Sequence, residues 1–176
     1  MKKLSSLILV IFAGKFAFSQ TKSAAEKWNT LAQANYTIQY PGNWEVDKSG
    51  QLSTSFMMFS PLESAQDKFR ENVNLLIQDL TGKNIDLNKF TQISEEQIKT
   101  LMKNSKIIES KRLKNGTQEF HKIIYKGQQQ NYDLEFEQYY WVIKNSAYIL
   151  TFTAEQGRFE NYKATREKIM SSFKLK

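Results

Sequence analysis

The chain has 176 residues with one histidine and no cysteine, and its formal net charge is +7 at pH 7. Without cysteine there are no disulfides, thiolate nucleophiles or thiolate metal sites, and a single histidine excludes most zinc centres. The length suits one ordinary domain that can bury a core.

Residues 1–19 have the three-part layout of a secretory signal peptide. Lys2 and Lys3 give a positive start, residues 4–13 are almost all apolar, and Ala17 and Ser19 are the small residues expected before a cleavage site. The apolar run covers about ten residues, whereas a membrane-spanning helix needs about 20. We therefore expect a periplasmic or secreted protein with no stable membrane span after cleavage. An uncleaved anchor is the alternative.

Cleavage after Ser19 would leave 22 basic and 18 acidic residues, a net charge of +4. The excess is spread along the chain, and no nucleic-acid-binding motif accompanies it. We expect a solvated basic edge and no nucleic-acid partner, with contact to an anionic surface as the alternative. The tightest basic group is Lys103, Lys106, Lys111, Arg112 and Lys114.

The first half of the chain predicts a tether followed by strands. Residues 20–34 are mostly small and polar, which indicates an N-terminal tether or a marginal helix ahead of a domain over 35–176. Alternation of apolar and polar residues predicts strands at 36–40, resuming at 44–46, and at 53–59 and 73–80. The strand at 53–59 is apolar on both faces, which is typical of an inner strand covered on both sides.

The second half predicts two helices around a run of strands. A helix is expected over Leu87–Met102, with Asp86 as its N-cap; Ser94 with Gln97 could instead restart it. Its apolar stripe comprises Phe90, Ile93, Ile98, Leu101 and Met102. Strands are expected at 107–113, 117–126, 132–143 and 147–154, with turns at Asn115-Gly116, at Gly127 with the Gln run that follows it, and at Asn145-Ser146.

The closing segment predicts a helix, because its apolar and long side chains recur on one helical face. These residues are Phe159, Tyr162, Arg166, Ile169 and Phe173. The whole pattern predicts an α+β fold: an antiparallel sheet of about six to seven strands flanked by two helices, an α/β/α sandwich.

Few residues could carry chemistry. His121 lies in a strand pattern with no nucleophile motif nearby, so we interpret it as structural or surface-exposed. Asp133, Glu135 and Glu137 share one strand face at a spacing of about 6.6 Å, too wide for one cation to bind all three unaided. We expect these carboxylates to be solvated, ionised and paired with Lys122 or Lys126; cation binding stays the alternative. No catalytic residue, metal ligand or cofactor is predicted.

The aromatic residues allow two interpretations. Tyr139, Tyr140 and Trp141 sit in mid-strand, and rings on the last helix follow them. A core between sheet and helix accounts for them. The alternative is an apolar pocket, as in a lipocalin-like carrier of a small molecule. A hydrolase is a third and weaker hypothesis, because no triad or metal set is present.

The segment from Tyr36 to Trp44 resembles the aromatic-x-Ile-x-Tyr-Pro-x-x-Trp opening of the PsbP-like family. That family includes extrinsic photosystem II subunits and bacterial DcrB-type proteins, and it shares a fold with Ran-binding Mog proteins. The resemblance implies a non-enzymatic domain that docks onto or assists another exported or membrane-bound protein. It also implies structural roles for Tyr40, Pro41 and Trp44. The photosynthetic role is not carried over, because nothing in the sequence marks a plastid protein.

Overall fold

The computed structural model describes residues 27–176. The signal segment predicted for residues 1–19, and residues 20–26 of the predicted tether, lie outside the described residues. The rest of the tether prediction needs correction, because Trp28–Ala32 forms a strand that pairs antiparallel with Tyr36–Pro41. No helix within residues 27–176 is long and apolar enough to cross a membrane.

The described residues form ten strands, two α-helices and one short 3-10 turn. In chain order they are β1 (Trp28–Ala32), β2 (Tyr36–Pro41), β3 (Glu45–Asp47), a 3-10 turn (Gln51–Ser53), β4 (Thr54–Phe59), β5 (Asn72–Asp79), α1 (Leu87–Leu101), β6 (Lys103–Asn115), β7 (Gln118–Gln129), β8 (Tyr132–Ile143), β9 (Ser146–Glu155), α2 (Lys163–Ser172) and β10 (Lys174–Leu175).

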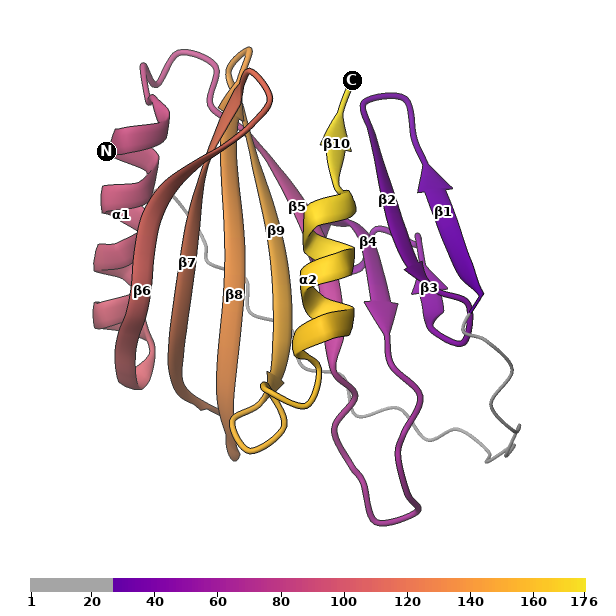
Figure 1. The fold of residues 1–176 in the computed structure, drawn as a ribbon. Coiled ribbons are helices and arrows are strands. Elements are labelled where there is room, and N and C mark those ends of the chain that lie inside the picture. The colour runs from indigo at the N-terminus through magenta and orange to yellow at the C-terminus, as the bar shows by residue number, and fades with distance from the viewer. Residues whose placement is uncertain (1–26) are drawn as a thin grey trace.

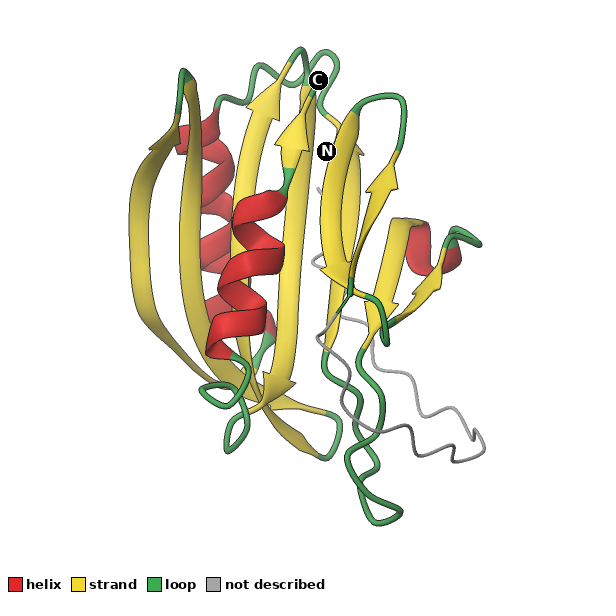
Figure 2. Ribbon diagram, turned by 45° about the vertical axis from the view of Figure 1, so that its right-hand side comes forward, coloured by secondary structure: helices red, strands yellow, loops and turns green. Residues whose placement is uncertain are grey.

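The strands form two sheets, and every neighbouring pair is antiparallel. The large sheet has seven strands in the order β3-β4-β5-β9-β8-β7-β6, and the small sheet has three in the order β1-β2-β10. Figure 2 shows α2 in front of the large sheet and α1 behind it. The predicted α+β sandwich of two helices around an antiparallel sheet is therefore confirmed, and the small sheet is an addition that the sequence pattern did not reveal.

The turn after β2 carries the chain from the small sheet to the large one. The Trp44 N–H donates to the Pro41 carbonyl at 3.0 Å, and the Gly42 N–H donates to the Lys27 carbonyl at 2.6 Å. A Cβ atom at position 42 would overlap that Lys27 carbonyl, so only glycine allows this close approach. Trp44 itself is 6% exposed.

Helix α1 begins as predicted at Leu87, because the Asp86 side chain accepts a hydrogen bond from the Lys89 N–H at 2.7 Å. The helix runs unbroken through Ser94, whose hydroxyl donates to the Phe90 carbonyl at 2.9 Å, so no restart occurs there. The prediction that Leu101 belongs to the apolar stripe is wrong, since this side chain is 71% exposed. The helix ends there and the chain turns directly into β6.

Helix α2 is shorter than predicted and begins at Lys163. Phe159 and Tyr162 lie in the turns that precede it, yet Phe159 is fully buried and supports the same core. Within the helix, Arg166, Ile169 and Met170 are buried. An arginine thus occupies one position of the face that packs on the protein.

Apolar side chains form a core on each side of the large sheet. The core on the α2 side contains residues of β2 and β4 and one face of β7, β8 and β9, and the core on the α1 side contains residues of α1 and the opposite face of β7, β8 and β9. Rings pack on one another on the α2 side, with centroid distances of 5.3 Å for Phe120–Trp141 and 4.9 Å for Trp141–Phe173. The core interpretation of the aromatic residues is confirmed. The large sheet is open, with β3 and β6 at its edges, so residues 27–176 do not form the closed barrel of a lipocalin-like carrier.

Gly127 lies inside β7 and not in a turn, which corrects the prediction made for it. The turn comes at the end of the predicted Gln run, where Gln130 adopts a positive φ of 52°. A Cβ atom at position 127 would collide with the Met102 side chain. Glycine therefore lets the residue that follows α1 pack directly on the strand.

Candidate functional site

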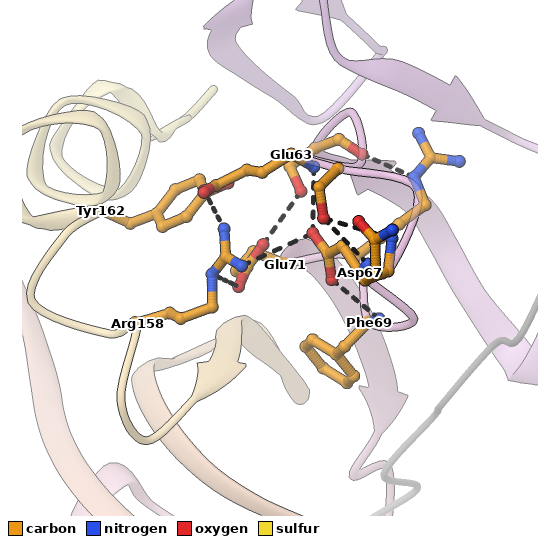
Figure 3. Close-up of polar contacts among 10 residues, drawn as sticks. Glu63, Asp67, Phe69, Glu71, Arg158 and Tyr162 are labelled. Atoms are coloured by element: carbon orange, nitrogen blue, oxygen red, sulfur yellow. Dashed lines mark hydrogen bonds and ion pairs between the residues drawn. The ribbon is translucent and has the colours of Figure 1, made fainter. Parts of the chain in front are cut away.

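A group of charged and polar side chains ties the connection between β4 and β5 to the segment between β9 and α2. We call it the Arg158 cluster; it comprises Glu63, Asp67, Glu71, Arg158 and Tyr162 (Figure 3). The connection extends beyond the end of the large sheet in Figure 1. Arg158 Nε lies 3.2 Å from Glu71 Oε1, and its Nη1 lies 3.6 Å from Asp67 Oδ2. The same guanidinium forms an ion pair with Glu63.

The three carboxylates of the Arg158 cluster differ in solvent exposure, from an exposed one at the surface to a buried one in the interior. The Glu63 side chain is 51% exposed, that of Asp67 is 4% exposed, and that of Glu71 is fully buried. Burial raises the pKa of the Glu71 carboxyl above its usual value, and the nearby charge of Asp67 adds to the rise. Burial also raises the pKa of Tyr162 to about 12, so its hydroxyl stays protonated and donates to Glu63 Oε1 at 3.0 Å.

The geometry of the Arg158 cluster fits a clamp better than a reaction centre. A guanidinium lies where a cation would have to bind, and no set of acidic or histidine side chains in residues 27–176 is arranged to hold a metal ion. Sequence reasoning missed the cluster. Its three carboxylates recur at every fourth residue of a segment with no regular pattern, and only the fold brings Arg158 to them.

The acidic row on β8 does not behave as predicted. Asp133 is exposed and Glu135 is half-buried, but Glu137 is buried. Burial raises the pKa of Glu135, and the charge of Glu160 raises it further. Lys126 lies opposite Glu135 in the strand register, as expected. The expectation of three solvated carboxylates is therefore wrong at Glu137, because α2 covers that part of the sheet.

Glu137 pairs with an arginine that the sequence placed on the apolar face of α2. Arg166 Nε lies 2.8 Å from Glu137 Oε2, and the two side chains are 5% and 1% exposed. Lys122 Nζ is a second cation, 3.7 Å from Glu137 Oε1. Arg166 also donates to the Phe159 carbonyl at 2.7 Å and lies over the Phe159 ring, 3.7 Å from its centroid. The pair joins α2 to the middle of the large sheet.

The single histidine joins α1 to the edge of the sheet. His121 Nε2 lies 2.7 Å from Ser110 Oγ, and the Ser110 hydroxyl donates to Glu95 Oε1 at 2.5 Å. Since that hydroxyl has one proton, it accepts from His121, which is then the Nε2–H tautomer. Burial lowers the pKa of His121, and the charge of Arg112 lowers it further, while Glu95 acts in the opposite direction. In residues 27–176, His121 Nδ1 is buried without a hydrogen-bond partner.

This arrangement differs from a nucleophilic serine with its base. An activated serine donates its proton to the imidazole, whereas Ser110 donates to the carboxylate and stands between the two groups. His121 is 8% exposed on the α1 side of the sheet. The contacts place it as a link between three elements, in keeping with a structural role.

The residues of the opening motif lie together at the crossing between the two sheets. Trp44 packs edge-on against Tyr162 at a centroid distance of 6.3 Å. Pro41 is buried at the end of β2, and Tyr40 is partly buried against the core on the α2 side. The turn thus contacts the Arg158 cluster through Tyr162.

No protein-family model matches the sequence, and no curated protein matches it. Solved structures match it well in fold. Cyanobacterial PsbP (CyanoP) from Synechocystis has a TM-score of 0.65 and 13% identity, covering 90% of this chain and 98% of that one. LpqN, described as involved in cell envelope biogenesis of Mycobacterium tuberculosis, has a TM-score of 0.62 and 11% identity, covering 86% and 92%. PA94 from Pseudomonas aeruginosa, of unknown function, has a TM-score of 0.60 and 10% identity, covering 82% and 94%. The chain therefore has the PsbP-like fold.

Proposed function

We propose that the chain is an exported, non-enzymatic binding module that docks onto or assists another exported or membrane-bound protein. Two findings support this. The fold is shared with CyanoP and with LpqN, and LpqN is involved in cell envelope biogenesis. The first nineteen residues have the layout of a secretory signal peptide.

The observation that carries the proposal is how the ionisable side chains are used. The buried candidates for acid–base work bridge separate elements: His121 links β7 to β6 and α1, and Glu137 links β8 to α2. Glu71 links the β4–β5 connection to the turn before α2. A general acid or base must reach a bound substrate with one of its polar atoms. In His121, Glu137 and Glu71 those atoms hold the structure together, which favours a scaffold for binding.

The test is photo-cross-linking in the native envelope. A photoreactive residue is placed at exposed positions on several faces, one at a time, in the full chain with its own leader. We expect discrete protein adducts from one face and none from the others. Uniform absence of protein adducts, with the chain recovered from the envelope and folded, would contradict a protein-binding role.

A second arm separates binding from catalysis. His121→Gln and Glu135→Gln are compared with the parent in complementation of the deletion phenotype, alongside Lys83→Gln as an exposed control. We expect both variants to complement as long as they fold and form the same cross-links. Loss of complementation with folding and cross-links intact would replace the binding module by an enzyme.

A further inference from the structure

Positive charge is concentrated on one hairpin of the fold. Strands β6 and β7 with their turn, residues 103–129, contain seven basic and two acidic residues, a net charge of +5. Residues 20–176 as a whole carry only +4. The rest of that chain is therefore slightly acidic, and the expectation of an evenly spread excess is corrected here.

The hairpin places most of these charges on an open sheet edge. Strand β6 ends the order of the large sheet and pairs only with β7 among the described strands (Figure 1). Five of the seven basic residues lie on β6, and they are the group that the sequence singled out. An edge strand directs alternate backbone N–H and C=O groups away from the sheet, where another extended chain can pair with them.

The two halves of β6 differ in their fitness for such pairing. Register shifts interrupt the first half, between Lys103 and Lys106 and again between Ile107 and Glu109. Ile108 is the extra residue of the second shift and is 50% exposed. From Glu109 to Asn115 the strand follows its partner without interruption. That regular stretch would present about 20 Å of edge.

Charge decides what can occupy this edge. Lys111 Nζ lies 2.7 Å from Glu109 and Lys114 Nζ lies 3.0 Å from Glu119, yet Lys111 and Lys114 remain 48% and 67% exposed. Arg112 has a neutral partner, the Asn88 side chain. A second copy of β6 would bring like charges together, which opposes pairing between two copies. An acidic strand would meet opposite charges along the same stretch.

We propose that the edge of β6 over Glu109–Asn115 takes up an extended acidic segment of a partner protein as an added strand. The backbone supplies the hydrogen bonds, and the basic side chains select the acidic sequence. This inference rests on the proposed function and names the surface and the class of partner for it. Ile108 and the partly buried Leu113 offer apolar contact beside the charges.

The experiment uses the chain of residues 20–176 and a blocked peptide of about 12 residues with alternating Glu and Val. Binding is followed by backbone amide chemical shifts. We expect the largest changes at Glu109–Asn115 and slower hydrogen exchange of the amides that face outward. The same peptide with alternate N-methylated backbone positions, which cannot join the ladder, is expected to bind about tenfold more weakly or worse.

Charge reversal provides the matched comparison. Lys111→Glu with Lys114→Glu should weaken peptide binding about tenfold, whereas Lys48→Glu with Lys83→Glu changes the net charge equally and should leave it unaltered. Equal weakening by both pairs would reduce the effect to net charge and overturn the proposal. Equal binding of the N-methylated peptide would also overturn it.

A lipid surface and a second copy are the competing occupants. Binding to phosphatidylglycerol vesicles in place of the peptide would overturn the proposal in favour of a membrane surface. Dimerisation through β6 without peptide would overturn it in favour of self-pairing. If cross-linking in the envelope finds a protein partner on another face while the peptide fails here, this inference is wrong and the proposed function stands.

Discussion

Replacing Arg166 by methionine is expected to destabilise the fold strongly. The substitution leaves Glu137, whose side chain is 1% exposed, with Lys122 at 3.7 Å as its remaining charged neighbour. It also removes the hydrogen bond to the Phe159 carbonyl. Removing one partner of a buried ion pair costs about 3–5 kcal/mol. In a domain of this size that loss lowers the melting temperature by about 10 °C or more.

The double variant tests whether the cost comes from the unpaired charge. Glu137→Leu combined with Arg166→Met removes both charges and keeps apolar volume, so its free energy of unfolding is expected within about 2 kcal/mol of the parent. Urea unfolding measures all three proteins, with unchanged m-values as the check that the folded states are comparable. A single variant within 1 kcal/mol of the parent, or a double variant as unstable as the single, would refute the reasoning.

Four further predictions follow from the contacts described. Trp44→Ala should lower the free energy of unfolding by about 3–5 kcal/mol, and a melting temperature equal to the parent's would contradict its role in the core. Burial lowers the pKa of His121, so the folded protein favours its neutral imidazole. The free energy of unfolding should therefore fall as pH drops below about 6.5, and His121→Gln should flatten that slope. Arg158→Gln should cost about 3 kcal/mol and speed proteolysis within residues 60–71; unchanged cleavage there would count against the clamp. N-terminal sequencing of the exported protein should begin at Gln20, and recovery of a soluble form that keeps Met1 would refute signal cleavage.

Local sequence patterns predicted most strands of the large sheet, and they predicted helix α1. The N-cap at Asp86 and the Asn-Gly pair are short-range signals; the cap lies where it was expected, and the turn lies one residue later than predicted, at Gly116-Thr117. Period-2 alternation found β4 and β5, and the two apolar faces of β4 match its inner position in the sheet. The same signals do not reveal β1, whose only large apolar residues are Trp28 and Leu31.

The charged contacts could not be predicted from neighbours in the sequence. Arg166 has helical spacing with apolar residues, and only the approach of α2 to β8 shows that it neutralises Glu137. Asp133, Glu135 and Glu137 are equivalent by alternation, but the helix that crosses the sheet buries just one of them. Gly127 suggests a turn from the sequence alone, and only the structure shows that glycine is needed there because the Met102 side chain packs against it.

The sequence by itself determined the fold class, the start of α1, the approximate position of the hairpin turn between β6 and β7, and the core character of the aromatic residues. These properties depend on backbone preferences and on periodicities of two or 3.6 residues, which act between near neighbours. Only the tertiary structure decided the division into two sheets, the burial of Glu137, the Arg158 cluster and the open basic edge of β6. Each of these depends on which distant segments meet, because desolvation and charge pairing act through space and do not follow the order of residues along the chain.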